Sequence, residues 1–231
     1  RIRAVLFPVL SVLIGVFAAL LILEAVVRVF PVYSGLYAVP VNAQQPVLRY
    51  LPNRDYTYSR GWNFQGVNTG HINNYGFIND QDYDPAAVAP LVAVIGDSYV
   101  EAAMVSFGKT LHGRLAELVQ GRGRVYSFGF SGAPLSQYLA WASWVKKTFH
   151  PNLLIVAIIG NDFDESLLRY KNTPGYYFDD SETGMPLVRV DTAHGIFQRT
   201  VRLSCVSALS RYVRQNLGLS GIVQRLYSPN V

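Results

Sequence analysis

Three short strand-like runs, two of them apolar throughout, are separated by segments of helical periodicity and constrain the fold of this 231-residue chain more than any other feature. The runs cover residues 91–95, 124–128 and 153–159, and the segments between them, 110–119 and 134–149, carry apolar residues at helical spacing. A β-α-β-α-β order is typical of two successive βαβ units. Because continuous apolar strands alternate with helices, the pattern predicts an α/β fold: a parallel sheet with helices on both faces and right-handed crossovers.

A second feature is the stretch of residues 4–23, which contains no charged residue. A helix of that length spans about 30 Å, the thickness of the hydrocarbon core of a bilayer. Arg1 and Arg3 precede it, and positive charges favour the cytoplasmic side. The sequence therefore predicts one uncleaved transmembrane helix, with residue 31 onward outside the cytoplasm. The alternatives are a cleavable signal peptide, whose apolar region is shorter, and a buried core helix.

Composition excludes several classes of protein. Half of the residues are hydrophobic and 15% are charged, which rules out a disordered or low-complexity chain. The single cysteine, Cys205, excludes an intramolecular disulfide framework. Excess positive charge lies at the two ends of the chain, so no nucleic-acid partner is expected. The basic C-terminal segment, with an amphipathic helix expected over 196–217, is compatible with anionic lipid or an acidic partner.

Residues 31–89 differ in composition from the rest of the chain. They are rich in Pro, Asn, Gly and aromatic residues and show no helical period, which indicates an ordered, extended wrap with short strands. We therefore predict three parts: a transmembrane anchor at 1–30, an aromatic-rich region at 31–89, and an α/β domain at 90–231 that is incomplete at its C-terminus.

A polar signature follows each apolar strand. Ligands bind outside the carboxyl ends of parallel strands, so these signatures are expected at one edge of the sheet. Taken singly, each has an ordinary structural explanation: a tight turn, a close backbone approach or a helix cap. Their recurrence after three successive strands predicts an acyl-transfer site, with a serine hydroxyl on a strand-to-helix turn and donors for an oxyanion around it. The signatures are Gly96-Asp97-Ser98, then Gly129 and Ser131-Gly132, then Gly160-Asn161-Asp162.

Over roughly residues 70–165 the chain resembles the SGNH (GDSL) hydrolase superfamily. Gly96-Asp97-Ser98 matches the first block of that family, Gly132 the second, and Asn161 with Asp162 the third, where Ile159 stands at the family's glycine position. The resemblance implies an SGNH-type, flavodoxin-like sheet in which Ser98 is the nucleophile and Gly132 and Asn161 complete the oxyanion hole. The segment 72–77 also resembles membrane-anchored bacterial members, which implies the bacterial inner membrane with the soluble domain in the periplasm.

The chain departs from the family pattern at the general base. The family's last block, Asp-x-x-His, is matched by Asp191 and His194, but Asp191 comes only 29 residues after Asp162, too few for the strands and helices that the family has there. We expect that His194 does not hydrogen-bond Ser98, and that the true block lies beyond Val231 or has been lost. The other three histidines, His71, His112 and His150, are expected to be structural or exposed. No metal or other cofactor is expected.

Two hypotheses of function emerge. The first is a membrane-anchored, extracytoplasmic serine esterase or O-acyltransferase that acts on an ester or an acylated saccharide, with membrane lipid as its partner through residues 4–23. The alternative is a non-catalytic SGNH-like structural subunit of a larger membrane complex, with other membrane proteins as partners. A histidine with a carboxylate partner that reaches Ser98 would discriminate between them.

Overall fold

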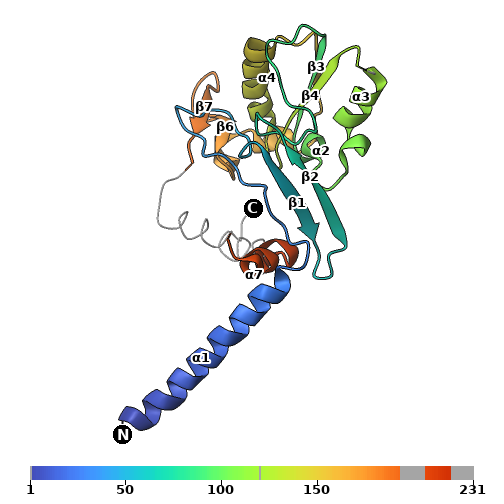
Figure 1. Ribbon diagram of the computed structural model, residues 1–231. Helices are drawn as coiled ribbons and strands as arrows, with labels where there is room; N and C mark the ends of the chain where they lie inside the picture. Colours follow the sequence, from blue (N-terminus) through green and yellow to red (C-terminus); the bar gives the residue numbers. More distant parts are fainter. Residues whose placement is uncertain (1, 120, 193–205, 220–231) are drawn as a thin grey trace. The chain divides into compact units, whose positions relative to one another are not determined.

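The structure, a computed structural model, describes residues 2–119, 121–192 and 206–219. The chain forms two compact units (Figure 1). The first comprises Arg1–Ser34, Thr57–Val67 and Gly195–Val231, and the second comprises Gly35–Tyr56 and Asn68–His194. The predicted parts at 1–30, 31–89 and 90–231 stay a prediction.

The first unit contains the apolar N-terminal segment as one long helix, α1 (Ile2–Val27). Its part from Leu6 to Val27 is long and apolar enough to cross a membrane, and none of the most apolar stretch is buried. Exposure of the whole stretch argues against a core helix, because a core helix has an apolar side that is covered. A membrane anchor and a signal sequence both fit this helix.

The second unit is built around a parallel sheet of three strands: β3 (Leu91–Gly96), β4 (Arg124–Gly129) and β5 (Leu153–Val156), in the order β4-β3-β5. Helices α3 (Leu111–Val119) and α4 (Leu135–Phe149) make the crossovers. The predicted β-α-β-α-β order and the parallel pairing are therefore confirmed.

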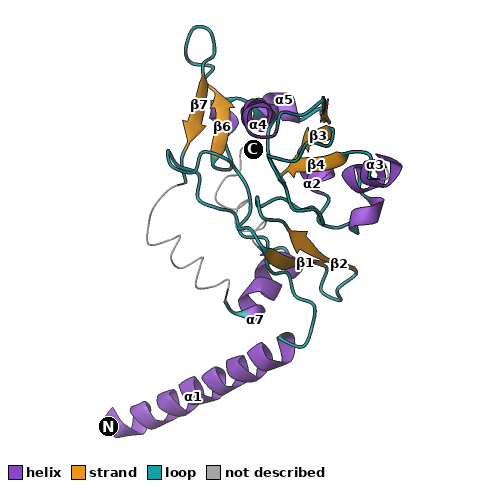
Figure 2. Cartoon of the chain, turned by 45° about the horizontal axis from the view of Figure 1, so that its top comes forward, coloured by secondary structure: helices purple, strands orange, loops and turns teal. Residues whose placement is uncertain are grey.

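Apolar side chains from both faces of the sheet are buried, as the unbroken apolar runs predict. On one face Leu91, Ala93 and Ile95 pack with α4 and with aromatic residues of β4. On the other face Val94 and Val125 pack with the helix after β3 and with α3. Figure 2 shows α4 and α3 on either side of β3 and β4.

The aromatic wrap of the second unit covers the free edge of β4. The Tyr83 hydroxyl accepts a hydrogen bond from the Ser127 backbone N–H (2.8 Å) and donates one to the Ser127 carbonyl (2.6 Å). The Asn79 amide donates to the Ser127 hydroxyl at 3.1 Å. These contacts satisfy backbone groups that an edge strand would otherwise leave unpaired. They explain why residues 73–83 are ordered without regular secondary structure.

The edge strand β5 differs from its prediction. It ends at Val156 rather than Ile159, and its apolar side chains are substantially exposed, Leu153 by 53% and Leu154 by 39%. The reason is its position: within the described residues β5 pairs with β3 alone, so one of its long sides carries no neighbour. An apolar composition predicts a strand correctly but does not say whether that strand is central.

The remaining elements are short. The turn-rich segment after residue 170 contains an antiparallel hairpin that the sequence pattern did not predict. A helix was expected over 196–217, and residues 196–205 of that range lie outside the described part. The second unit adds α2 (Ser98–Glu101), η1 (Phe107–Lys109), α5 (Asp162–Glu165), η2 (Leu168–Tyr170) and the hairpin β6 (Gly175–Phe178) with β7 (Leu187–Val190). The first unit adds α7 (Ala208–Arg211) and a π-helical turn, η3 (Tyr212–Asn216), while the hairpin β1 (Arg54–Arg60) with β2 (Gly66–Ile72) belongs partly to each unit.

Candidate functional site

The carboxyl ends of all three parallel strands lie at one edge of the sheet. Gly96 at the end of β3 is opposite Gly129 at the end of β4, and Ile95 is opposite Val156 of β5. The first two predicted signatures begin at these strand ends and the third begins at Gly160, four residues after the end of β5, so all three follow the same edge of the sheet. A contact among the three side chains and backbone groups stays a prediction.

Ser98 is the first residue of α2, immediately after the turn that ends β3. The Asp97 carboxylate accepts a hydrogen bond from the Tyr99 N–H at 2.9 Å and so caps the helix. Within the described ranges the Ser98 backbone N–H and hydroxyl have no hydrogen-bond partner, and the residue is half-buried. Both groups are therefore available to a ligand.

Two glycines allow this turn to pack. A β-carbon at Gly96 would collide with the Val100 side chain, and one at Gly129 would lie 2.5 Å from the Glu101 backbone nitrogen. Helix α2 thus crosses the ends of β3 and β4 at a distance that only glycine permits. These glycines hold α2, and with it Ser98, against the edge of the sheet.

Gly132 lies in an exposed turn with a φ of +77°, and nothing lies within 4 Å of the position of its missing β-carbon. Conformation rather than space therefore requires glycine here. Its N–H also has no hydrogen-bond partner among the described residues. That the Gly132 N–H donates to an oxyanion stays a prediction.

Asn161 occupies the cap position before α5, yet its side chain makes no capping hydrogen bond and is exposed. The ordinary explanation for an asparagine at this place, a helix cap, does not hold. The turn is instead fixed by Asp162, whose Oδ2 accepts hydrogen bonds from the Ile159 N–H (2.8 Å) and the Tyr138 hydroxyl (3.0 Å). Asp162 therefore leaves the Asn161 amide free for another partner.

A group of buried carboxyls at this edge was not predicted. Asp97, Glu101 and Asp162 are all buried, and burial raises the pKa of Glu101 and of Asp162, with the Asp97 charge adding to both. Burial, together with the charges of Asp97 and Asp162, also raises the pKa of Tyr138. Residues adjacent to Ser98 and to Asn161 thus lie close enough to interact electrostatically.

Glu101 is held by the wrap. Its carboxylate accepts a hydrogen bond from the Tyr50 hydroxyl at 2.8 Å, and the Tyr50 ring stacks on Phe130, the residue after β4. Glu101 comes three residues after Ser98 on the same helix. That spacing was visible in the sequence and could have indicated an acid near the candidate nucleophile, because residues three apart are neighbours on a helix surface.

The candidate base is only partly described. His194 lies outside the described residues. Asp191 pairs with Arg189 at 2.6 Å, and the adjacent Thr192 exchanges hydrogen bonds with Val41, which ties the end of β7 to the wrap. The carboxylate that would orient His194 is thus engaged by an arginine.

The other three histidines are buried or exposed away from Ser98, and they were expected to be structural or exposed. His71 on β2 is partly exposed and pairs with Asp55 at 2.9 Å. His112 on α3 is fully buried, and His150 ends α4 at the opposite, amino-terminal edge of the sheet. No histidine in the described ranges hydrogen-bonds the Ser98 hydroxyl, and no three potential metal ligands gather within those ranges.

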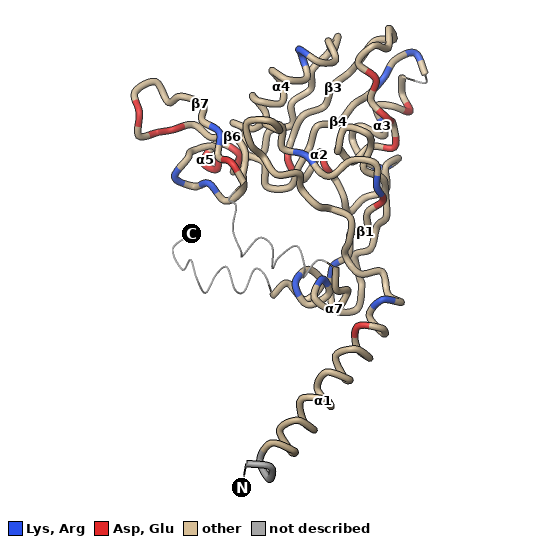
Figure 3. Tube along the Cα trace, turned by 60° about the vertical axis from the view of Figure 1, so that its left-hand side comes forward, with Lys and Arg blue, Asp and Glu red and all other residues tan. Residues whose placement is uncertain are grey.

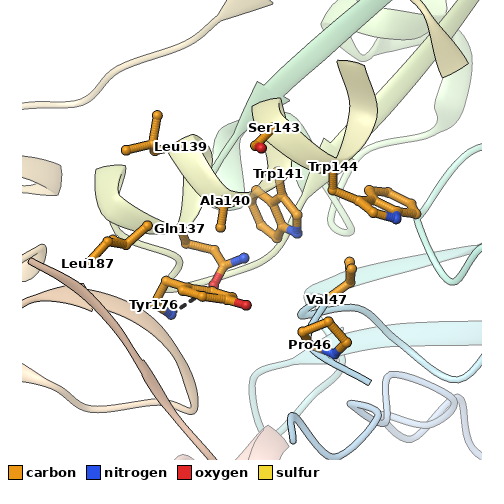
Figure 4. Close-up of a pocket in the computed structure, with 10 residues that line it drawn as sticks. All are labelled: Pro46, Val47, Gln137, Leu139, Ala140, Trp141, Ser143, Trp144, Tyr176 and Leu187. Atoms are coloured by element: carbon orange, nitrogen blue, oxygen red, sulfur yellow. Dashed lines mark hydrogen bonds between the residues drawn. The ribbon is translucent and has the colours of Figure 1, made fainter. Parts of the chain in front are cut away.

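The hollows of the second unit include two that are lined by described residues. One, of about 280 Å³, has a mixed lining that includes His71, Asp80, Ser106 and His112. The other, of about 370 Å³, runs along α4 and is lined by mainly apolar side chains (Figure 4). Ser98, Gly132 and Asn161 line neither hollow. The residues of the second are Pro46, Val47, Gln137, Leu139, Ala140, Trp141, Ser143, Trp144, Tyr176 and Leu187.

Comparisons with protein-family models, with curated proteins and with solved structures find no match.

Proposed function

We propose that this chain is a membrane-anchored, extracytoplasmic serine esterase or O-acyltransferase of the SGNH type. One observation carries the proposal. Ser98 begins a helix at the carboxyl end of the central strand, with its hydroxyl and N–H unpaired among the described residues, while Gly132 and Asn161 come after the two neighbouring strands. Polar groups that need partners and have none in the fold are what a site for a polar ligand requires.

The chemistry is set by these groups. The Ser98 oxygen attacks the carbonyl carbon of an ester while its proton passes to a general base, and the carbonyl electron pair becomes an oxyanion. The N–H groups of Ser98 and Gly132 and the Asn161 amide stabilise that oxyanion. The intermediate then expels the alcohol, which takes the proton from the base. Water or a sugar hydroxyl attacks the acyl-serine by the same proton transfers in reverse and restores Ser98.

The proposed location rests on α1. Its charge-free stretch, residues 4–23, suits the hydrocarbon core, and Arg1 and Arg3 favour a cytoplasmic N-terminus, which would put the second unit in the periplasm of a bacterium. Resistance of the chain to extraction by alkaline carbonate would support this anchor. Recovery of a soluble protein that begins after Val27 would contradict it.

A second candidate function is that of a non-catalytic subunit of a membrane complex. It is favoured by one observation: within the described ranges no histidine hydrogen-bonds the Ser98 hydroxyl, and Asp191 is paired with Arg189. Without a base the serine hydroxyl stays protonated and reacts poorly, with a loss of about 10³-fold or more.

The deciding experiment measures hydrolysis of an activated acetyl ester by the full chain in vesicles, beside Ser98→Ala and His194→Ala. Ser143→Ala, an exposed serine on α4, is the matched control. Rapid hydrolysis that Ser98→Ala abolishes supports the enzyme, and loss in His194→Ala as well would make Asp191 and His194 the catalytic pair. Equal, slow rates in all four proteins would favour the structural subunit.

A further inference from the structure

The C-terminal end of α1 is joined to α7 through one carboxylate. Glu24 accepts hydrogen bonds from the Ser207 hydroxyl (2.7 Å), the Ala208 N–H (3.0 Å) and the Leu209 N–H (2.9 Å). These are the first groups of α7, which helix geometry leaves without internal partners. A side chain of the apolar helix therefore caps a second helix more than 180 residues later in the chain, and α7 lies at the end of α1 (Figure 1).

Aromatic rings fix a third segment at the same place. The Phe30 ring stacks on Phe64 in the β1–β2 loop at 5.3 Å, and Phe64 contacts the Tyr212 ring at 5.5 Å. The Tyr212 hydroxyl donates a hydrogen bond to the Trp62 carbonyl at 2.7 Å. Residues 24–30, 59–65 and 206–217 thus form one packed structure, which we call the juxtamembrane collar.

The collar exposes a combination of side chains that soluble surfaces seldom carry. Trp62 is 71% exposed, and Val29 is 79% exposed. The same segments contain four arginines against the single carboxylate of Glu24, which pairs with Arg28 at 2.8 Å, and charged residues are absent from α1 between Arg3 and Glu24 (Figure 3). Exposed tryptophan beside arginine is the composition of a membrane–water interface, where indole rings lie at headgroup level and cations meet lipid phosphates. The arginines are Arg28, Arg60, Arg211 and Arg214.

We propose that the collar binds the lipid headgroup layer, with the Trp62 indole inserted at the interface. The inference rests on the proposed anchor. The charge-free stretch 4–23 rises about 30 Å along the helix axis, enough to fill the hydrocarbon core, so Glu24 and the residues after it enter the headgroup layer. Phe30 is one of them, and its stacked partner Phe64 lies two residues from Trp62.

Lipid rather than a protein is the partner that these observations favour. The most apolar stretch of α1, within Leu6–Val27, is exposed and leads directly into the collar. A bilayer that covers the helix must also meet whatever is packed against its end. The collar then fixes the first unit on the membrane through three segments of the chain instead of one.

The test reconstitutes the full chain in vesicles of phosphatidylcholine and phosphatidylglycerol, with and without bromine on the acyl chains near the headgroup. Bromine quenches tryptophan emission at short range. The chain has three tryptophans, and Trp141 and Trp144 belong to the second unit, so the difference between wild type and Trp62→Phe isolates the Trp62 signal. Trp62 is exposed, so phenylalanine is tolerated there without loss of packing.

We expect bromine to remove most of the Trp62 signal, so that wild type loses a larger fraction of its emission than Trp62→Phe. Equal fractional losses in the two proteins, with both resistant to carbonate extraction, would overturn the collar and leave the anchor intact. Release of wild type by carbonate would overturn the anchor, and the collar with it.

Discussion

The Tyr138 hydroxyl on α4 donates a hydrogen bond to Asp162 Oδ2 across 3.0 Å, inside the second unit. The same oxygen accepts the Ile159 N–H, so one carboxylate connects a helix to the turn that carries Asn161. The other oxygen, Oδ1, is buried and has no hydrogen-bond partner in the described part of the chain. The position of the candidate oxyanion donor therefore depends on a buried acid that is held by the Ile159 N–H of its own turn and by the Tyr138 hydroxyl of α4.

Removing that hydroxyl should loosen the turn. Tyr138→Phe leaves Asp162 with one hydrogen bond fewer in a buried site, and we expect the free energy of unfolding to fall by about 1–3 kcal/mol. Urea denaturation in detergent micelles measures the change. Tyr99→Phe, on an exposed ring, is the control and should change little. A neutral Tyr138→Phe would mean that water replaces the hydroxyl.

Acid should destabilise the second unit through His112. Its ring is fully buried beside Phe107, neither ring nitrogen has a hydrogen-bond partner in the described ranges, and burial lowers its pKa from 6.5 to about 4. The unfolded chain protonates His112 near pH 6.5 while the folded chain does not. Stability due to this group is therefore complete above about pH 6.5 and is lost as the pH falls toward 4, by about 2 kcal/mol at pH 5.

His112→Phe removes this titration and keeps the ring. We expect the stability of this variant to vary less between pH 7 and pH 5 than that of wild type, by the same 2 kcal/mol approximately. His150→Phe controls for the loss of an imidazole, since His150 is exposed. Parallel pH profiles for wild type and His112→Phe would show that another group causes the acid sensitivity.

The glycines at the ends of the strands should differ sharply in tolerance. Gly129→Ala puts a β-carbon 2.5 Å from the Glu101 backbone nitrogen, which forces α2 away from β4, so we expect a loss of several kcal/mol or failure to fold. Gly160→Ala, a site with nothing within 4 Å, should be neutral. Gly132→Ala should cost about 1–2 kcal/mol because its φ is positive. Thermal unfolding of the three variants ranks them.

In the first unit, Glu24→Gln should weaken the start of α7. The amide side chain carries no charge and can no longer accept three hydrogen bonds through two carboxylate oxygens, which costs about 0.5–2 kcal/mol at a helix N-terminus. Amide hydrogen exchange at Ala208 and Leu209 should accelerate about 2–30-fold. Glu117→Gln, in an exposed ion pair with Arg114 on α3, should leave those amides unchanged.

Local pattern was enough to predict the three strands, because an apolar run followed by glycine indicates a strand without reference to distant residues. It gave the ends of β3 and β4, but β5 ends at Val156, before its apolar run does. The pairing of Glu24 with Ala208, or of Thr192 with Val41, joins segments more than 150 residues apart, and no periodicity encodes such a pair. The β6–β7 hairpin was missed because its strands are only four residues long and are separated by a polar turn. The buried carboxyls were missed because burial of an acid is a property of the packed state.

The last prediction concerns Asn161 in the candidate site. If Asn161 supplies an oxyanion donor, Asn161→Ala should lower kcat by about 10²–10³-fold with little change in KM, because the lost hydrogen bond forms only as charge develops on the substrate oxygen. Asn161→Asp should be as impaired, since a carboxylate repels the oxyanion, whereas a cap would accept aspartate. Asp164→Asn, an exposed neighbour, is the matched control. Activity retained in Asn161→Ala, with the ester assay otherwise dependent on Ser98, would remove Asn161 from the site.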